Sequence, residues 1–458
     1  MRFAAPSTKS AVLGAIALVF SGIFLLIKNL SEQIPIAFLT QTVWFNVFTG
    51  WLAHISKMLF IVGITAIIIA LILRITMSDT TRICLMVKKS LFCYEYGNPL
   101  HLKEDELLPS VRCKTAGNGI FELTITATTV TVENIQNLSS SISSSLNGKR
   151  YKQYAVTQTN TDLAFNEVTF RIEDVTIDKS LIINNINEIK PESPTKLLIQ
   201  KDTYIDLTTS GSILVSGKTR SGKTTSIIFI ILSVLLAGRD KYDSRIIIID
   251  PKQAELSRLP HVVTLDADGE ATAILEAVRC FADSVVKRQQ ILNDLSEKKG
   301  DAVHWWDAGF HASILFIDEY VACRTIFPQK PSKENPEYCL ATFDSLLKRI
   351  VTMGASAGNF VIISIAEASV MEGGLPSILR SAMTTKILFK PTITEGRFLW
   401  DSEKLKDFNT GRVYHAGDAW FSSTDGVHDN VSYVHFPIMN FAVYRELGKL
   451  LDAYYRTE

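Results

Sequence analysis

The sequence SILVSGKTRSGKTT, residues 212–225, decides the fold of this chain. A short apolar run leads into a loop that contains Gly217 and Gly222, and a second apolar run follows at 227–237. Glycines let the backbone bend so that successive N–H groups converge on phosphate oxygens, and the N-terminal end of the next helix adds a favourable dipole. The segment therefore predicts a P-loop between a buried strand and a helix.

Each position of this loop has an expected contact with a nucleoside triphosphate. Lys223 is expected to reach the β- and γ-phosphates, and Thr224 is expected to ligate Mg²⁺. The residues expected around the nucleotide are Gly217, Lys218, Thr219, Arg220, Ser221, Gly222, Lys223, Thr224 and Thr225. The predicted cofactors are therefore ATP and Mg²⁺.

Two apolar strands that end in aspartate compete to complete the site. They are RIIIID at 245–250 and SILFIDE at 313–319. Hydrolysis needs one carboxylate for the metal shell and a second one to polarise the attacking water. Asp318 and Glu319 supply both at adjacent positions, whereas a proline and a lysine follow Asp250. The sequence thus favours Asp318 as the metal-site aspartate and Glu319 as the general base, with a capped helix start as the alternative.

The surrounding pattern alternates strands with helices. A further apolar strand is expected at 359–365, and the segment 271–295 has the apolar spacing of an amphipathic helix. This alternation predicts an α/β fold with a mostly parallel sheet, of the RecA-like P-loop ATPase type. The tip of the strand at 359–365 makes Ser364 and Glu367 candidates for sensing the γ-phosphate.

Two uncharged apolar stretches lie near the N-terminus, at about 10–27 and 57–75. A cleaved signal peptide and buried core helices are alternatives, but a two-helix membrane hairpin fits best. Basic residues flank the pair on one side of the membrane: Arg2, Lys9, Arg74, Arg82, Lys88 and Lys89. By the positive-inside tendency, we expect a multi-pass protein of the cell membrane with both termini in the cytoplasm.

The segment between the membrane end and the P-loop region has a different character. The stretches 121–133 and 169–177 alternate apolar and polar residues and indicate half-exposed strands. The Ser/Asn-rich segment 137–148 is expected to be a flexible loop. The predicted division is a membrane hairpin at 1–80, a small β-rich adaptor domain at 81–196 and a motor at 197–458.

Composition adds two constraints. The 47 basic and 47 acidic residues give a formal net charge of zero, so any nucleic-acid partner must meet a local basic surface. The six cysteines are scattered without a C-x-x-C pair, which argues against a disulfide framework or a zinc site.

Four segments together resemble the motor of the FtsK/SpoIIIE DNA translocases. They are SGKTRSGKTT at 216–225, IIIDPKQAELS at 247–257, ILFIDEY at 314–320 and MGASAGNFVIIS at 353–364. The D-P-K-x-x-E-L-S pattern is far more specific to that family than the P-loop alone. The resemblance extends over about residues 198–421 and implies a homo-hexameric ring that moves DNA through a central pore with ATP.

Two positions depart from the family pattern. The family motif G-R-A-A-G has Ala355 in place of its arginine, and the sensor glutamine of the fourth strand is replaced by Glu367. These changes concern nucleotide sensing rather than nucleotide binding. The family places cations that act across subunits in the segment with Arg380, Lys386 and Arg397, and Arg397 is the first candidate for a trans-acting arginine; a surface ion pair is the alternative.

The arrangement of two spans, a short adaptor and about 35 residues after position 421 is similar to the TcpA-like coupling proteins of Gram-positive conjugative plasmids and integrative elements. We therefore expect a coupling ATPase that delivers DNA to a secretion channel, with a relaxase and channel proteins as possible partners. A chromosome-segregating translocase and a nucleotide-gated membrane scaffold with little hydrolysis are the alternatives. We find neither the L-S-G-G-Q signature of transporter ATPases nor a helicase D-E-A-D box.

Overall fold

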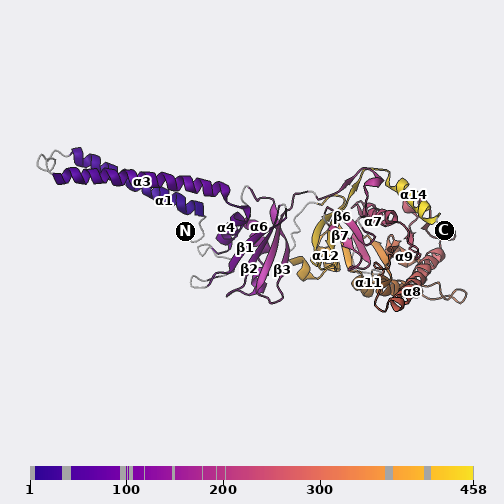
Figure 1. Cartoon of the computed structure of the whole chain (residues 1–458). Coiled ribbons are helices and arrows are strands. Elements are labelled where there is room, and N and C mark those ends of the chain that lie inside the picture. Colours follow the sequence, from indigo (N-terminus) through magenta and orange to yellow (C-terminus); the bar gives the residue numbers. More distant parts are fainter. Residues whose placement is uncertain are drawn as a thin grey trace. The chain divides into compact units, whose positions relative to one another are not determined.

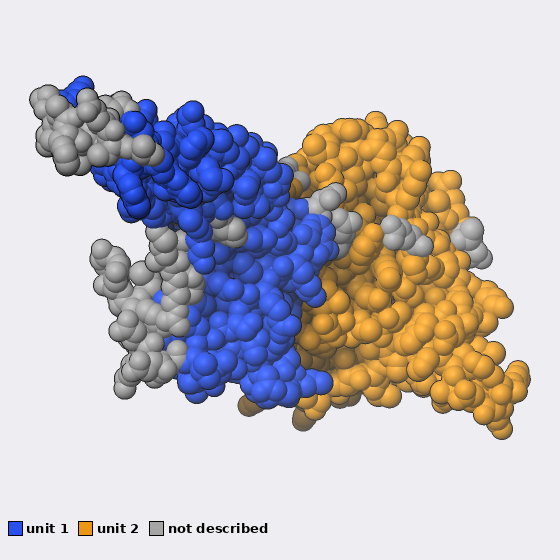
Figure 2. Space-filling model, turned by 60° about the vertical axis from the view of Figure 1, so that its left-hand side comes forward, with its two compact units in different colours: residues 1–176 blue, residues 177–458 orange. Residues whose placement is uncertain are grey.

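The computed structural model divides the chain into two compact units, Met1–Thr176 and Ile177–Glu458 (Figure 2). The described residues are 6–33, 43–92, 99–100, 102, 107–117, 119–146, 150–177, 179–191, 193–201, 203–366, 375–406 and 414–456. The second unit begins at Ile177, whereas the sequence predicts that the motor begins at residue 197. The three-part division of the chain remains a prediction.

Two long helices form a hairpin at the start of the first unit. Helices α1 (Pro6–Gln33) and α3 (Val43–Thr76) run side by side (Figure 1). Their candidate membrane spans are Ser7–Ser31 and Trp44–Thr76, with mean hydropathies of 2.5 and 2.8. Only 11% of each apolar window is buried, which does not fit core helices of a soluble domain. Length and composition suit membrane anchoring, and the second helix begins earlier than predicted.

Small residues bring the two helices together. A Cβ on Gly14 would lie 2.8 Å from the carbonyl oxygen of Gly63, so the backbones touch there. Further along, Ser21 Oγ donates to Ser56 O at 2.9 Å and Ser56 Oγ donates to Ser21 O at 3.0 Å. Close backbone approach and hydroxyl hydrogen bonds are the usual means of helix association in a bilayer.

Beyond the hairpin, the described residues of the first unit form a four-stranded antiparallel sheet in the order β1-β2-β4-β3 and three helices. Its elements are α4 (Asp79–Leu91), β1 (Ser110–Gly117), β2 (Ile120–Thr126), α5 (Val132–Gln136), α6 (Ser139–Ser145), β3 (Tyr154–Thr161) and β4 (Glu167–Asp174). Alternate side chains such as Leu123 and Phe170 are buried in a core that Val87 of α4 completes. The α+β architecture agrees with the alternation seen in the sequence.

Two sequence expectations in this region are wrong. The strand expected over 121–133 ends at Thr126, and its last residues belong to α5. The segment expected to be a flexible loop contains α6 instead. Leu138, Ile142 and Leu146 are all buried at a spacing of four residues, so one apolar stripe packs this helix onto the core. The stripe was missed because serines fill the positions between its three apolar residues.

The second unit is built on an eight-stranded sheet in the order β10-β9-β11-β12-β8-β13-β14-β15. Its strands are β8 (Ile213–Gly217), β9 (Ile246–Ile249), β10 (Val262–Val263), β11 (Ser313–Ile317), β12 (Asn359–Ile365), β13 (Thr385–Phe389), β14 (Asp418–Ser422) and β15 (Ser432–His435). The six strands from β10 to β13 are parallel neighbours, and β14 and β15 are antiparallel. This confirms the predicted mostly parallel RecA-like sheet.

Helices cover both faces of this sheet. They are α7 (Lys223–Ala237), α8 (Thr272–Lys299), α9 (Tyr320–Ile326), α10 (Leu340–Met353), α11 (Ser377–Ala382), α12 (Ile393–Leu399), α13 (Ser402–Lys406) and α14 (Val443–Tyr455). Alternate residues of each central strand enter different cores: Phe316 packs with α7 and α14, whereas Leu315 packs with α8 and α10. Because α7 is buried between the sheet and α14, its run of Ile and Leu is apolar on nearly all sides.

Short strands complete the second unit. The hairpin β6 (Lys196–Gln200) and β7 (Thr203–Asp206) is antiparallel, and β5 (Ile182–Ile183) pairs in parallel with β16 (Ile438–Met439). The pairing of β5 with β16 joins the beginning of the unit to the segment just before α14.

Candidate functional site

The P-loop has the backbone geometry that its glycines predict. β8 ends at Gly217, and Gly222 adopts a left-handed conformation (φ 93°) directly before α7 starts at Lys223. A Cβ on Gly217 would lie 2.8 Å from Phe389 Cβ, and a Cβ on Gly222 would lie 2.6 Å from the backbone nitrogen of Gly417. Both positions therefore exclude a side chain for steric reasons as well as conformational ones.

A second loop supports the P-loop from the side. The Gly417 N–H, just before β14, donates to the carbonyl oxygen of Ser221 at 2.9 Å. The loop side chains Lys218, Thr219 and Arg220 are exposed, so they are accessible to a ligand.

Lys223 connects the carboxyl ends of three strands. Its side chain is only 7% exposed, and Nζ donates to Glu319 Oε1 at 3.3 Å and to the carbonyl oxygen of Ile365 at 3.1 Å. Lys223 follows β8, Glu319 follows β11, and Ile365 ends β12. A buried ammonium group at this point gives the site a positive charge directed at the edge of the sheet where a phosphate would lie.

Glu319 is held by a second cation. Its Oε2 lies 3.5 Å from Nζ of Lys252, which belongs to the D-P-K turn after β9. The residue itself has a left-handed backbone (φ 47°, ψ 58°) at the start of α9, an unusual conformation for a side chain other than glycine or asparagine. Strained backbones of this kind concentrate at functional sites.

The other candidate carboxylate, Asp250, is hydrogen-bonded to the backbone of the turn that follows it. Its two oxygens accept hydrogen bonds from the backbone nitrogens of Lys252 at 3.1 Å, Ala254 at 2.9 Å and Ser257 at 3.0 Å. These bonds fix the D-P-K turn and leave Asp250 little capacity for a metal ion. The geometry therefore assigns this residue a structural task.

Asp318 has the opposite environment. Its Oδ1 is buried and accepts no hydrogen bond from the described residues. Burial raises the pKa of the Asp318 carboxyl, while the hydroxyl of Ser364 and the ammonium of Lys223 oppose that rise. A buried carboxylate oxygen without a donor is costly unless a cation or water meets it.

Several buried polar atoms around this edge share that lack of a partner within the described residues. They are Ser216 Oγ, Ser221 Oγ and Asp318 Oδ1. The described residues contain no group of three or more His, Cys, Asp or Glu side chains suited to a metal ion. Mg²⁺ ordinarily takes one or two protein carboxylates and completes its shell with water and phosphate. The residues present thus fit a Mg²⁺–triphosphate rather than a metal bound by protein alone.

The predicted trans-acting cation lies in a different place. Arg397 is exposed on α12 and lines a cavity of about 550 Å³ together with Arg380 and Lys386. Arg380 Nη1 donates to the carbonyl oxygen of Phe398 at 3.2 Å, and Lys386 Nζ donates to that of Leu399 at 2.8 Å, so both cations cap the end of α12. Burial and the nearby Arg380 lower the pKa of Lys386. A role for Arg397 towards a neighbouring subunit remains a prediction.

The candidate sensor Glu367 lies outside the described residues, which resume at 375. The other candidate, Ser364, sits on β12 beside Asp318. Two contributors escaped the sequence reading: Lys252, which contacts the expected base, and Gly417, which supports the P-loop. Lys252 was visible in principle, because β9 and β11 are parallel neighbours and their carboxyl ends must meet.

Comparisons with known proteins agree with this geometry. Residues 188–374 match the FtsK/SpoIIIE family. The FtsK domain-containing protein YdcQ of Bacillus subtilis is 27% identical over 151 residues, which is 33% of this chain and 28% of YdcQ. The DNA translocase FtsK of Haemophilus influenzae is 33% identical over 126 residues, which is 27% of this chain and 21% of that protein. The matches thus span less than a third of each relative.

Among solved structures, this chain is similar to the pCW3 conjugation coupling protein TcpA in its monomer form with ATPγS, at 14% sequence identity and a TM-score of 0.45. The match covers 82% of this chain and 99% of that chain. ATPases 2 and 3 of EssC from Geobacillus thermodenitrificans are similar at 16% identity, with a TM-score of 0.42 and coverages of 62% and 53%.

Proposed function

We propose, from the premise that residues 188–374 form a domain of the FtsK/SpoIIIE family, that this chain is a membrane-anchored ATPase that moves DNA. The observation that carries the proposal is the meeting of Lys223, Glu319 and Asp318 at one edge of the sheet, where Asp318 Oδ1 has no hydrogen-bond partner among the described residues. A phosphate-binding lysine, a base and a metal-site carboxylate are the three protein groups that phosphoryl transfer to water requires.

The roles follow from the contacts. The backbone N–H groups of 217–224 hold the phosphates, and Lys223 neutralises their charge. Thr224 and Asp318 would hold the Mg²⁺ ion, which would supply positive charge to screen the triphosphate. Glu319 takes the proton of the attacking water, and the cations of Lys223 and Lys252 orient its carboxylate.

The membrane end gives this motor its location. Helices α1 and α3 are apolar and exposed enough to anchor the chain in a bilayer. The basic residues beside both spans support an orientation with both termini and the motor in the cytoplasm, where ATP is present.

We propose further that the motor acts as a conjugative coupling protein, assembled as a homo-hexamer, that delivers DNA with its relaxase to a secretion channel. Two membrane-compatible helices combined with a motor of this family support the idea. DNA binding would rest on phosphate contacts from Lys and Arg and should weaken steeply with salt.

The test uses the full chain purified in detergent. We expect Mg²⁺-dependent phosphate release that rises when DNA is added, and the rise should shrink as salt increases. Hydrolysis that does not respond to DNA would contradict a translocase. In cells, deletion should abolish transfer of a conjugative element while division stays normal; a segregation defect with intact transfer would instead point to a chromosome translocase.

A further inference from the structure

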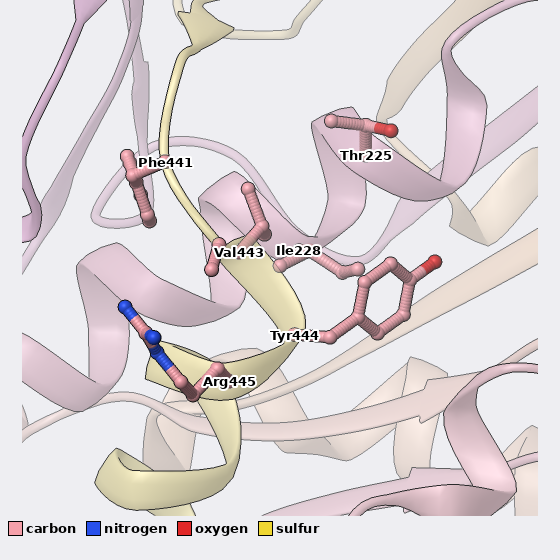
Figure 3. A pocket seen from close by; sticks show the side chains of 7 residues that line it. Thr225, Ile228, Phe441, Val443, Tyr444 and Arg445 are labelled. Atoms are coloured by element: carbon pink, nitrogen blue, oxygen red, sulfur yellow. The ribbon is translucent and has the colours of Figure 1, made fainter.

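A cavity of about 430 Å³ opens beside the first turns of α7, where the P-loop ends (Figure 3). One wall is α7 itself, with Thr225 and Ile228 one turn apart. The other wall is the segment that leads into α14, with Phe441, Tyr444 and Arg445. Ligand sites typically have 300–1,000 Å³ and an apolar lining with few polar groups. This cavity has that size and that composition.

Its position follows from the P-loop. Thr225 comes directly after Thr224, so the cavity begins one residue beyond the loop that cradles the phosphates. The γ-phosphate end of a bound triphosphate points to Lys223 and Glu319. With the γ-phosphate directed at Glu319, the α-phosphate end would lie beside the residues that follow Lys223 in the first turn of α7, and the nucleoside would continue from there.

The chemistry of the lining suits an aromatic ring. Figure 3 shows the side chain of Ile228 directed at the ring of Tyr444, with Thr225 on the adjacent turn of α7. Tyrosine and phenylalanine rings and an aliphatic side chain offer stacking surfaces to a flat heterocycle. The Arg445 side chain is 70% exposed, and its Nε donates to Glu446 Oε1 at 3.2 Å, so it leaves the stacking surface to the other lining residues.

Tyr444 is oriented by the second family segment. Its hydroxyl donates to Glu255 Oε2 at 2.9 Å, and Glu255 belongs to the turn that Asp250 fixes after β9. The ring position is therefore set by the same turn that carries Lys252 to Glu319. The turn after β9 thus contacts both Glu319, through Lys252, and the cavity residue Tyr444, through Glu255.

We infer that this cavity receives the purine base of the nucleotide, with Tyr444 as its stacking partner. The inference rests on the proposed function, because it assumes that a triphosphate lies on the P-loop. It assigns the C-terminal helix α14 to nucleotide recognition, a task that the motifs in the sequence do not reveal.

The test compares two ligands in the full chain in detergent with Mg²⁺, by titration calorimetry. One is the imido analogue of ATP, and the other is inorganic tripolyphosphate, which has no base. Tyr444→Ala should weaken the ATP analogue about ten-fold, as expected for loss of one base–aromatic stack, and leave tripolyphosphate unchanged. Tyr444→Phe keeps the ring but loses the bond to Glu255, so it should weaken the ATP analogue less than Tyr444→Ala does and leave tripolyphosphate unchanged.

A second variant fills the cavity without removing a contact. Ala442 is exposed on the cavity wall, so Ala442→Trp should occupy the space and weaken only the ATP analogue. Lys449→Ala changes an exposed residue of the same helix outside the cavity and should have no effect.

The outcomes separate this inference from the proposed function. If the parent binds neither ligand, or Lys223→Ala binds both as well as the parent, the P-loop site itself is wrong and the inference falls with it. If binding depends on Lys223 but Tyr444→Ala and Ala442→Trp retain parental affinity for the ATP analogue, the inference alone is overturned. Equal weakening of both ligands would also overturn it, because the cavity would then shape the phosphate site and not hold a base.

Discussion

Lys223 and Glu319 form an ion pair, with Nζ 3.3 Å from Oε1, although they follow strands β8 and β11, which are not neighbours in the sheet. β12 lies between these strands, and its last residue, Ile365, accepts a hydrogen bond from the same Nζ at 3.1 Å. The ammonium group thus contacts the proposed base and lies where Lys223 is expected to bind phosphate. On the proposed function, one side chain would link phosphate binding to base orientation.

Glu319→Gln separates binding from hydrolysis. The amide cannot take a proton from water, so we expect phosphate release to fall by about 10²–10⁴-fold, the usual contribution of a general base. Binding of ATP should persist, because Lys223 and the P-loop backbone are unchanged. Phosphate release and equilibrium ATP binding, measured on the same preparation, check this. Equal, negligible turnover in the parent and the variant would favour the nucleotide-gated scaffold.

Lys252→Ala tests the second cation at Glu319. Lys252 is half exposed, so solvent screens its 3.5 Å contact with Oε2 and the effect should be moderate. We expect kcat to fall about three- to ten-fold, equivalent to ~0.6–1.4 kcal/mol, with KM for ATP nearly unchanged. Steady-state kinetics of the purified chain provide the measurement.

The control for Lys252 is Lys287→Ala, an exposed lysine on α8 that pairs with Asp243 at 3.5 Å, away from the site. It should hydrolyse ATP at the parental rate. A rise in KM with constant kcat in Lys252→Ala would mean that Lys252 binds nucleotide and does not orient Glu319.

The central sheet was predictable because burial of its strands on both faces requires apolar residues, and those residues are adjacent in the sequence. A strand buried on both faces, such as Ser313–Ile317, must be a continuous apolar run, and that run is visible in the sequence. Helix α6 was missed because its evidence is three apolar residues within a serine-rich segment, and only packing on the adaptor core selects the helix.

The candidate site was predictable in part for a related reason. The P-loop and Asp318–Glu319 are contiguous motifs, and the residue types alone indicate the chemistry. The contacts of Lys252 and Gly417 depend on which strand ends lie together, a property of the sheet order. Tyr444 comes from a helix almost two hundred residues beyond Glu255, and no spacing rule connects them.

Asp318→Asn should stabilise the chain when Mg²⁺ is absent. The buried Oδ1 has no donor among the described residues, and burial raises the carboxyl pKa, so replacing the carboxylate by a neutral amide should remove part of the cost of burying its charge. We expect a higher Tm than the parent in chelator. Adding Mg²⁺ and ATP should raise the parental Tm but change that of the variant little, since the proposed metal ligand is lost.

Thermal unfolding with chelator and with Mg²⁺–ATP measures both effects. The same Mg²⁺–ATP shift in both proteins would refute the assignment of Asp318 to the metal. Asp250→Asn is the informative comparison: its turn loses charge-assisted bonds to Ala254 and Ser257, so it should lower the Tm in chelator.

Arg288→Met should destabilise the second unit. The side chain is fully buried, with Nη1 3.3 Å from Asp240 Oδ2, Nε donating to Ala357 O at 2.9 Å and Nη2 donating to His311 O at 2.7 Å. Its removal leaves the buried Asp240 carboxylate without its counter-charge and takes a donor from the carbonyl oxygens of Ala357, Tyr242 and His311, at a cost of about 3–5 kcal/mol. Denaturant unfolding of the full chain gives the change.

The matched control is Arg349→Ala, because Arg349 forms an exposed pair with Asp283 at 2.8 Å. Its loss should cost less than ~1 kcal/mol. Similar destabilisation by both substitutions would contradict the view that burial sets the importance of the Arg288 network.

Gly14→Leu tests the packing of the membrane hairpin. Its Cβ would lie 2.8 Å from the Gly63 carbonyl oxygen, so a leucine must push α1 away from α3. A Ser21→Cys/Ser56→Cys pair reports the separation, since the two native hydroxyls lie 3.2 Å apart and the thiols should form a disulfide on mild oxidation. We expect cross-linking in membranes to drop strongly in Gly14→Leu. Gly22→Leu, at a position with no atom within 4 Å of the added Cβ, should cross-link like the parent. Equal cross-linking in both leucine variants would show that close contact at Gly14 does not hold the helices together.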